Sequence, residues 1–203
     1  MIELDKLKFV LRKTKLLGSD RYENSAEHSW QVCMLAQLLA QESTVPINVV
    51  RVVELLLVHD IPEIDTGDQI VYQPKSEGGV QRERQAAERI FGLLPEPQSS
   101  WCLNRWEEYE SRQSKEAVFA YAVDRLMPVL HNLQNSGQSW KENDIPLEKI
   151  LKVNSAIGSA LPSVWLYVET LIKEFAAESL PSSAVVDAQS TIRAGRAKAR
   201  PSI

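Results

Sequence analysis

The spacing of apolar residues is helical along almost the whole chain. Apolar positions recur three and four residues apart, and no clean alternation of apolar and polar residues runs for six positions. Glycine, which favours turns, is scarce, with 8 residues in the chain. We therefore expect an all-α protein. The predicted helices, with ends placed to within a few residues, are 3–17, 24–42, 46–60, 80–94, 98–112, 114–135 and 146–178, the last interrupted around 158–162.

The second predicted helix has a clear beginning and an apolar face. Asn24 is a favoured N-cap residue, and Glu27 three residues later completes a capping-box pattern. His28 follows in the first turn and shares a helical face with Val32 and Leu35. The pattern predicts that the imidazole of His28 points toward the core.

The third predicted helix begins near Pro46, a favoured first-turn residue. It ends at His59 and Asp60, because Pro62 cannot continue the helical hydrogen bonds. His59 follows a run of inward-facing apolar residues, so we expect its ring to face the core. The apolar residues that predict burial of this helix are Val49, Val52, Val53, Leu56 and Leu57. The loop at 61–68 carries three carboxylates, Glu63, Asp65 and Asp68.

The sixth predicted helix carries Asp124 among small and apolar residues such as Ala120 and Met127. We expect this carboxylate to be paired, because burying an unpaired charge is energetically unfavourable. His131 lies two turns further along the same face, about 10 Å away. We interpret His131 as a core or second-site histidine.

Four groups on these three helices can meet if the helices pack together: His28, His59, Asp60 and Asp124. Two imidazoles and two carboxylates suit a divalent transition metal and leave coordination positions for water or substrate. Each residue alone is weak evidence, since an inward histidine is more often a hydrogen-bonded core residue. A buried aspartate likewise more often joins two helices. Their joint pattern favours a catalytic metal site.

Length and composition are typical of one globular domain. The chain has 203 residues, of which 44 % are hydrophobic and 25 % are charged. No stretch approaches the ~18 apolar residues that a membrane span needs. We place a single helical domain at 1–179. We expect 180–203, which is rich in alanine and serine, to be a flexible or weakly docked tail.

Net charge and cysteine content limit which binding partners and which cellular compartment we expect. A net charge of −4 argues against a nucleic-acid polymer as partner, but it allows a small phosphorylated substrate in a local basic pocket. Cys33 and Cys102 are expected to be reduced thiols in apolar helical patterns. The first residues lack the apolar core of a signal peptide. We therefore expect a cytoplasmic protein.

The segments around the four groups resemble one known family, the HD-domain metal-dependent phosphohydrolases. Residues 21–30 are similar to its first-histidine segment. Residues 59–68 are similar to the HD-x-x-E-x-x-x-G-D stretch of its 5′-deoxynucleotidase-like branch. Lys75, Glu83 and Ala86-Ala87 resemble the K…E…A-A run that follows. The resemblance covers about residues 5–175.

The resemblance implies an HD-domain helical bundle of about six to eight helices. It implies one divalent ion, Mn, Co, Fe, Ni or Zn, held by a ligand set of four residues. It also implies phosphomonoester hydrolysis of a nucleoside 5′-monophosphate, in which Glu63 and Asp68 position or deprotonate the attacking water. Asp65 has no role in the motif. The implied ligands are His28, His59, Asp60 and Asp124.

A phosphate also requires cations. The family places an arginine near the end of the first helix, followed by a tryptophan; here Arg12 stands in that region and no tryptophan follows. The candidates for binding the substrate are Arg12, Lys75, Arg21 and Lys13, and we favour the first two.

Two other functions fit the same residues. Another HD-domain reaction, phosphodiester cleavage or alarmone hydrolysis, would use the same metal ligands. A non-catalytic helical module could instead bind metal only for stability, although such a module has no use for Glu63 and Asp68. The family and the five tryptophans of the chain also suggest a homodimer.

Overall fold

The computed structural model describes residues 2–73 and 78–179, and the predicted tail and Lys75 lie outside this part. The all-α class is confirmed, with nine α-helices in the described part of the chain. In chain order the elements are η1 (Ile2–Phe9), β1 (Leu11–Lys15), β2 (Tyr22–Asn24), α1 (Ser25–Leu39), η2 (Ala40–Glu42), α2 (Val49–Val58), α3 (Glu63–Thr66), α4 (Gly79–Phe91), α5 (Gln98–Ser111), α6 (Lys115–Gln134), α7 (Gln138–Glu142), α8 (Leu147–Asn154), η3 (Ser155–Ser159) and α9 (Pro162–Ser179), where η marks a 3₁₀ helix.

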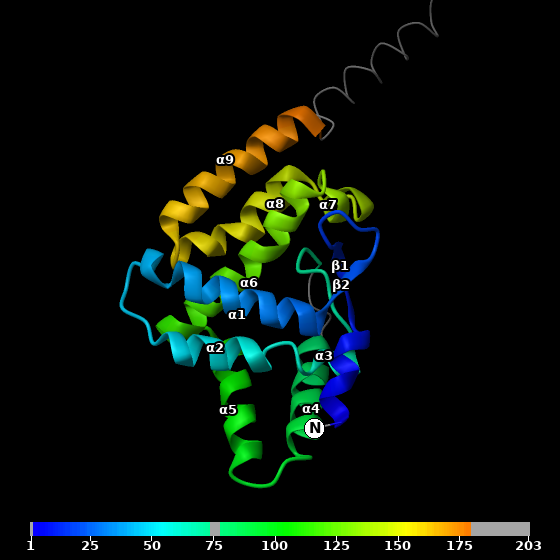
Figure 1. Ribbon diagram of the computed structural model, residues 1–203, viewed down its shortest axis with the longest axis vertical. Helices are drawn as coiled ribbons and strands as arrows, with labels where there is room; N and C mark the ends of the chain where they lie inside the picture. Colours follow the sequence, from blue (N-terminus) through cyan, green and yellow to red (C-terminus); the bar gives the residue numbers. More distant parts are fainter. Residues whose placement is uncertain (1, 74–77, 180–203) are drawn as a thin grey trace, which may run out of the picture.

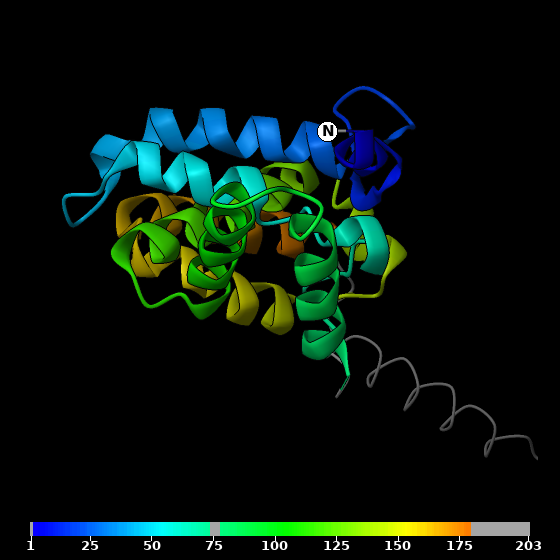
Figure 2. The same ribbon diagram turned by 90° about the horizontal axis from the view of Figure 1, so that it is seen from below.

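Helix α6 is the centre of the packing. It contacts α1, α2 and α5 on one side and α8, η3 and α9 on the other. Helices α1 and α2 lie side by side in front of it, as Figure 1 shows, and Figure 2 shows the same pair from below. Phe119, Ala120 and Val123 of α6 are completely buried in the main core. Because α1, α2 and α6 all meet here, polar groups on their inner faces are brought together.

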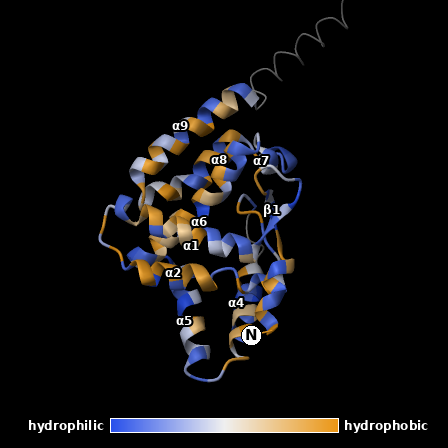
Figure 3. Ribbon diagram, in the orientation of Figure 1, coloured by the Kyte–Doolittle hydropathy of each residue, from blue (hydrophilic) through white to orange (hydrophobic). Residues whose placement is uncertain are grey.

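Helix α2 is hydrophobic along most of its length, whereas α4 and α5 carry more hydrophilic positions (Figure 3). Asn48 caps α2, with its side chain accepting from the amide of Arg51. A second, smaller core lies between α4, α5 and the N-terminal segment. It contains Leu7, Val58, Ile61, Ala87, Ile90, Phe91 and Trp106.

The predicted helix at 3–17 is wrong beyond Phe9. The chain instead forms a short antiparallel ribbon, in which β1 and β2 pair Leu11 with Asn24. In β1, Arg12 and Thr14 are buried, whereas Leu11 and Lys13 are exposed. A half-buried strand is recognised by apolar residues at every second position. Here the buried positions are polar, so the sequence shows no such alternation.

Most of the other predicted helices are present, with some differences in number and extent. The long C-terminal segment is divided into α8, η3 and α9, as the interruption at 158–162 predicts. The short helices α3 and α7 were not predicted, which is why the count exceeds eight. The described helices include none that is both long and apolar enough to cross a membrane.

Two neighbouring leucines near the end of α2 provide a matched test of this packing. Leu56 is completely buried, whereas Leu57 is 52 % exposed. We expect Leu56→Ala to lower the free energy of unfolding by about 2–5 kcal/mol, because it leaves a cavity in the core. Leu57→Ala should lower it by about 1 kcal/mol or less. Urea unfolding followed by circular dichroism measures both, and equal losses would contradict this orientation of α2.

Candidate metal centre

Helix α1 begins at the site and places His28 in its first turn. The expected capping box is present: Asn24 accepts from the amides of Ala26 and Glu27, and the Glu27 side chain accepts from the amide of Asn24. This cap fixes where the helix begins, and so fixes the direction of His28. The imidazole is completely buried, and its Nε2 lies 2.9 Å from Oδ1 of Asp124.

His59 stands at the C-terminal end of α2, where the helix gives way to the turn before Pro62. Its Nδ1 lies 2.7 Å from the carbonyl oxygen of Leu56, which fixes the ring. Its Nε2 points into the cluster, 3.1 Å from Oδ1 of Asp60 and 3.7 Å from Oδ1 of Asp124. Burial opposes a charge on this ring, but the two carboxylates outweigh it and raise the pKa of His59 to about 10.

Asp124 is held by a residue of α5 and by the next residue of its own helix, α6. Its Oδ2 accepts hydrogen bonds from the hydroxyl of Tyr109 at 2.7 Å and from Nη2 of Arg125 at 2.8 Å. Burial opposes ionisation, but Arg125 and the two histidines hold the pKa of Asp124 well below its usual range. One oxygen is thus anchored, while Oδ1 faces His28 and His59.

These residues fit a divalent transition metal. One ligand atom from each of His28, His59 and Asp60 lies within 4.8 Å of the others, close enough for a single ion to reach all three. Oδ1 of Asp124 joins them from α6. The buried Nε2 of His59 makes no hydrogen bond to the described residues. Binding of an ion at this nitrogen would displace the proton that the neighbouring carboxylates favour on the ring. Imidazole nitrogens with carboxylate oxygens are donors that Mn, Fe, Co, Ni and Zn accept.

A cavity of about 160 Å³ gives access to this cluster. Three of the four groups line its wall, namely His59, Asp60 and Asp124. Glu63 lines it too, and Ser25 donates to Oε2 of Glu63 at 2.6 Å. The remaining lining residues that carry charge or an aromatic ring are Glu83, Trp106, Tyr109, Glu110, Arg112, Tyr121 and Arg125.

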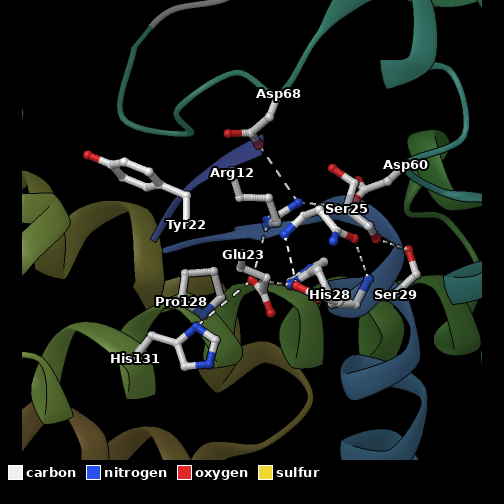
Figure 4. A network of polar contacts seen from close by, with 12 residues as sticks. Arg12, Tyr22, Glu23, Ser25, His28, Ser29, Asp60, Asp68, Pro128 and His131 are labelled. Carbon is white, nitrogen blue, oxygen red and sulfur yellow. Dashed lines mark hydrogen bonds and ion pairs between the residues drawn. The ribbon is translucent and has the colours of Figure 1, made fainter. Parts of the chain in front are cut away.

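Arg12 lies beside the cluster and joins it to the loop after α3. Its Nη1 donates to Oδ2 of Asp60 at 2.8 Å and lies 3.8 Å from Oδ1 of Asp68, as Figure 4 shows. Burial opposes ionisation of Asp60, but His59 and Arg12 lower its pKa to about 2. Arg12 also borders a second cavity of about 330 Å³, together with Lys13.

One of the predicted cations stands apart from this arrangement, and another is not described by the structure. Arg21 is exposed and forms a two-pronged ion pair with Glu27 at the beginning of α1, and it borders neither cavity. Lys75 lies outside the described residues. Asp65, for which we expected no role, pairs with Arg89 on the surface.

Several neighbours of the cluster were not identified from the sequence. Tyr109 and Arg125 hold Asp124, and Glu23 lies beside His28. Arg112 lies with its guanidinium 4.2 Å from the ring centre of Tyr121, in the wall of the first cavity. Arg125 directly follows Asp124 in the chain, and this adjacency is the one signal that the sequence offered for these contacts. No spacing rule links α5 to α6 or β2 to the first turn of α1, so the contacts of Tyr109 and Glu23 give no signal in a single sequence.

A family model described as HD domain matches residues 4–165 of the chain, and this match decides the family. The chain belongs to the HD-domain family. The matched region includes all four residues of the cluster, and the family predicted from the motifs is confirmed.

Solved structures agree with this assignment. A predicted metal-dependent phosphohydrolase from Magnetospirillum magnetotacticum has a TM-score of 0.81 and 40 % identity, with 87 % of this HD-domain chain and 91 % of that chain covered. The PH0347 protein from Pyrococcus horikoshii has a TM-score of 0.61 over 84 % of this chain and 96 % of that chain. At 20 % identity, this second likeness shows the fold alone.

Curated relatives match a shorter region. The 5′-deoxynucleotidase HDDC2 of Homo sapiens is 33 % identical over 112 residues, which are 54 % of this chain and 53 % of the relative. The chain therefore spans about half the length of the curated relatives it matches.

The cluster generates a prediction about metal and stability. At a free metal concentration about 100-fold above the dissociation constant, the bound ion should raise the free energy of unfolding by about 2.7 kcal/mol. A chelator should remove this increment, and His59→Ala should not show it. Elemental analysis after desalting, combined with urea unfolding, measures both effects. Stabilisation of His59→Ala equal to that of the wild type would mean that metal binds elsewhere.

Proposed function

We propose that the protein is a metal-dependent phosphohydrolase that releases phosphate from nucleoside 5′-monophosphates. The observation that carries this proposal is the cluster of two imidazoles and two carboxylates, of which His59, Asp60 and Asp124 line a cavity that Glu63 also lines. The names of the similar proteins support it, since they describe a metal-dependent phosphohydrolase and 5′-deoxynucleotidases.

The ligands in this proposal are His28, His59, Asp60 and Asp124, and the cofactor is one divalent transition metal. When bound, such an ion neutralises charge on phosphoryl oxygens and lowers the pKa of water. The chain supplies the rest of the chemistry. The positive charge of Arg12 orients Asp60, and Arg125 orients Asp124, so the ligand carboxylates are held in place before substrate arrives.

Glu63 is the proposed general base. It lines the cavity and is held by the hydroxyl of Ser25. Burial, together with the nearby charge of Asp60, raises the pKa of Glu63 well above its usual value. A carboxylate of raised pKa takes a proton from water more readily. Water supplies the oxygen that bonds to phosphorus, and one of its protons passes to Glu63. As the ester bond breaks, Glu63 gives that proton to the leaving nucleoside oxygen, so the free nucleoside and phosphate are released and Glu63 is a carboxylate again.

Asp68 and the cations complete the proposed site. Burial raises the pKa of the Asp68 carboxyl, which lies close to Arg12, and we assign it the role of a second acid-base group although it borders neither cavity. Within residues 2–73 and 78–179, Arg12 and Arg125 each donate to a carboxylate of the cluster, and we assign phosphate binding to them. Lys75 and Arg21 stay predictions, as do the homodimer and the cytoplasmic location.

The direct test is a phosphate-release screen with the metal that elemental analysis identifies. The panel contains deoxynucleoside and ribonucleoside 5′-monophosphates, cyclic dinucleotides and guanosine tetraphosphate. We expect turnover of the 5′-monophosphates that a chelator abolishes and metal restores. Turnover of only the cyclic dinucleotides or the tetraphosphate would replace this function with another HD-domain reaction. Metal binding without turnover of any phosphate ester would favour a structural role.

Two acidic residues in α3 provide a matched pair for the mechanism. Glu63 faces the cavity, whereas Asp65 pairs with Arg89 on the surface. We expect Glu63→Gln to lower kcat by about 10²–10⁴-fold while it keeps its metal, because the proton acceptor is lost. Asp65→Asn should retain kcat within about twofold, because exposed ion pairs contribute little. Steady-state kinetics with metal analysis decide, and equal effects of the two variants would exclude Glu63 as the base.

A further inference from the structure

Glu23 is a buried carboxylate to which neither the sequence motifs nor the proposed chemistry assigns a role. It lies in the middle of β2 and is completely buried. Neither of its carboxylate oxygens has a hydrogen-bond partner among the described residues. A carboxylate in this setting is energetically unfavourable unless nearby groups compensate its charge. Its surroundings therefore indicate what it does.

Three nitrogen atoms from three different elements surround Oε2 of Glu23, as Figure 4 shows. Nδ1 of His28 in α1 is the nearest, at 3.4 Å. Nε of Arg12 in β1 lies at 3.6 Å, and Nδ1 of His131 in α6 lies at 3.9 Å. The ribbon of β1 and β2 thus places Glu23 directly behind the first histidine of the cluster.

The two ring nitrogens of His28 have different neighbours. Nε2 faces Asp124 and the cluster, while Nδ1 faces Glu23. A neutral imidazole that binds metal through Nε2 carries its proton on Nδ1, and an acceptor at Nδ1 fixes this tautomer. In His59 the carbonyl oxygen of Leu56 fills the same position relative to Nδ1.

We propose that Glu23 is a positioning residue that accepts the Nδ1 proton of His28, and so directs the Nε2 lone pair of that histidine toward the metal cluster. The inference rests on the proposed function, because it presumes that the cluster holds an ion. The 3.4 Å separation lies just beyond the usual hydrogen-bond range. A small rotation of the Glu23 carboxylate that closed the gap would break no existing hydrogen bond.

A role as counter-charge for Arg12 alone explains Glu23 less well. Arg12 already donates to Asp60 at 2.8 Å and lies near Asp68, so two other carboxylates balance its guanidinium. His131 supplies little positive charge, because burial lowers the pKa of its imidazole. His28 is the closest of the three neighbours, and it is the one whose other nitrogen faces the cluster.

Two substitutions of Glu23 separate the two roles. Glu23→Gln and Glu23→Met both remove the charge, but only glutamine keeps an oxygen that can accept the proton of Nδ1. Co²⁺ is the probe, bound to the full-length protein in competition with a chelator, and its visible absorption spectrum reports the ligand set. His131→Leu is the matched control, since it removes a different neighbour of the same carboxylate oxygen.

We expect Glu23→Met to weaken Co²⁺ binding by about 10–100-fold and to change the absorption spectrum, because His28 is no longer held. Glu23→Gln should show a smaller loss of about threefold or more, with a spectrum close to that of the wild type. His131→Leu should bind within about twofold of the wild type.

Wild-type affinity and spectrum in both Glu23 variants would overturn the inference and leave the proposed function intact. Equal losses in Glu23→Gln and Glu23→Met would also overturn it, in favour of the counter-charge role. If Glu23→Met does not fold, unchanged affinity of Glu23→Gln still contradicts the proposal. Failure of the wild type to bind Co²⁺, Mn²⁺ or Zn²⁺ would overturn both this inference and the proposed function.

Discussion

The carboxylate of Asp124 joins the three helices on which the site depends. Tyr109 and Arg125 anchor one of its oxygens, and the other oxygen faces the Nε2 atoms of His28 and His59. These contacts are buried, so each polar group requires a partner in a defined place. The beginning of α1, the end of α2 and the middle of α6 are therefore held in one register. The same buried contacts therefore pack the three helices together and hold the side chains of the cluster in place.

Two buried arginines face the carboxylates around this point. Arg12 compensates the carboxylates of Asp60 and Asp68 on one side of the cluster, and Arg125 compensates Asp124 on the other. Buried charges paired in this way contribute little net stability, but they orient the groups that they contact. A cavity of about 160 Å³ lies beside them, lined by His59, Asp60 and Asp124. A hydrolytic metal site needs metal-binding side chains that are held in place and a cavity from which substrate can reach them. These two features link the fold to the proposed chemistry.

Sequence patterns predicted the parts of this structure that rest on local rules. The capping box at Asn24 and the inward directions of His28 and His59 follow from helical periodicity and from the stop at Pro62. The strand β1 was missed because its inward residues are polar, and α3 and α7 are too short for periodicity to show. Contacts between different elements, such as Tyr109 with Asp124 or Glu23 with His28, depend on how those elements pack. The spacing of residues in the sequence does not show this packing.

The central claim is that these four side chains hold one divalent ion at the cavity wall. Crystals of the protein loaded with Mn²⁺ or Co²⁺, measured at the absorption edge of the metal, would test it most directly. The account predicts one anomalous peak within coordination distance of His28, His59, Asp60 and Asp124, about 2.0–2.3 Å from their donor atoms. A peak elsewhere, or an ion that Asp124 does not reach, would contradict it.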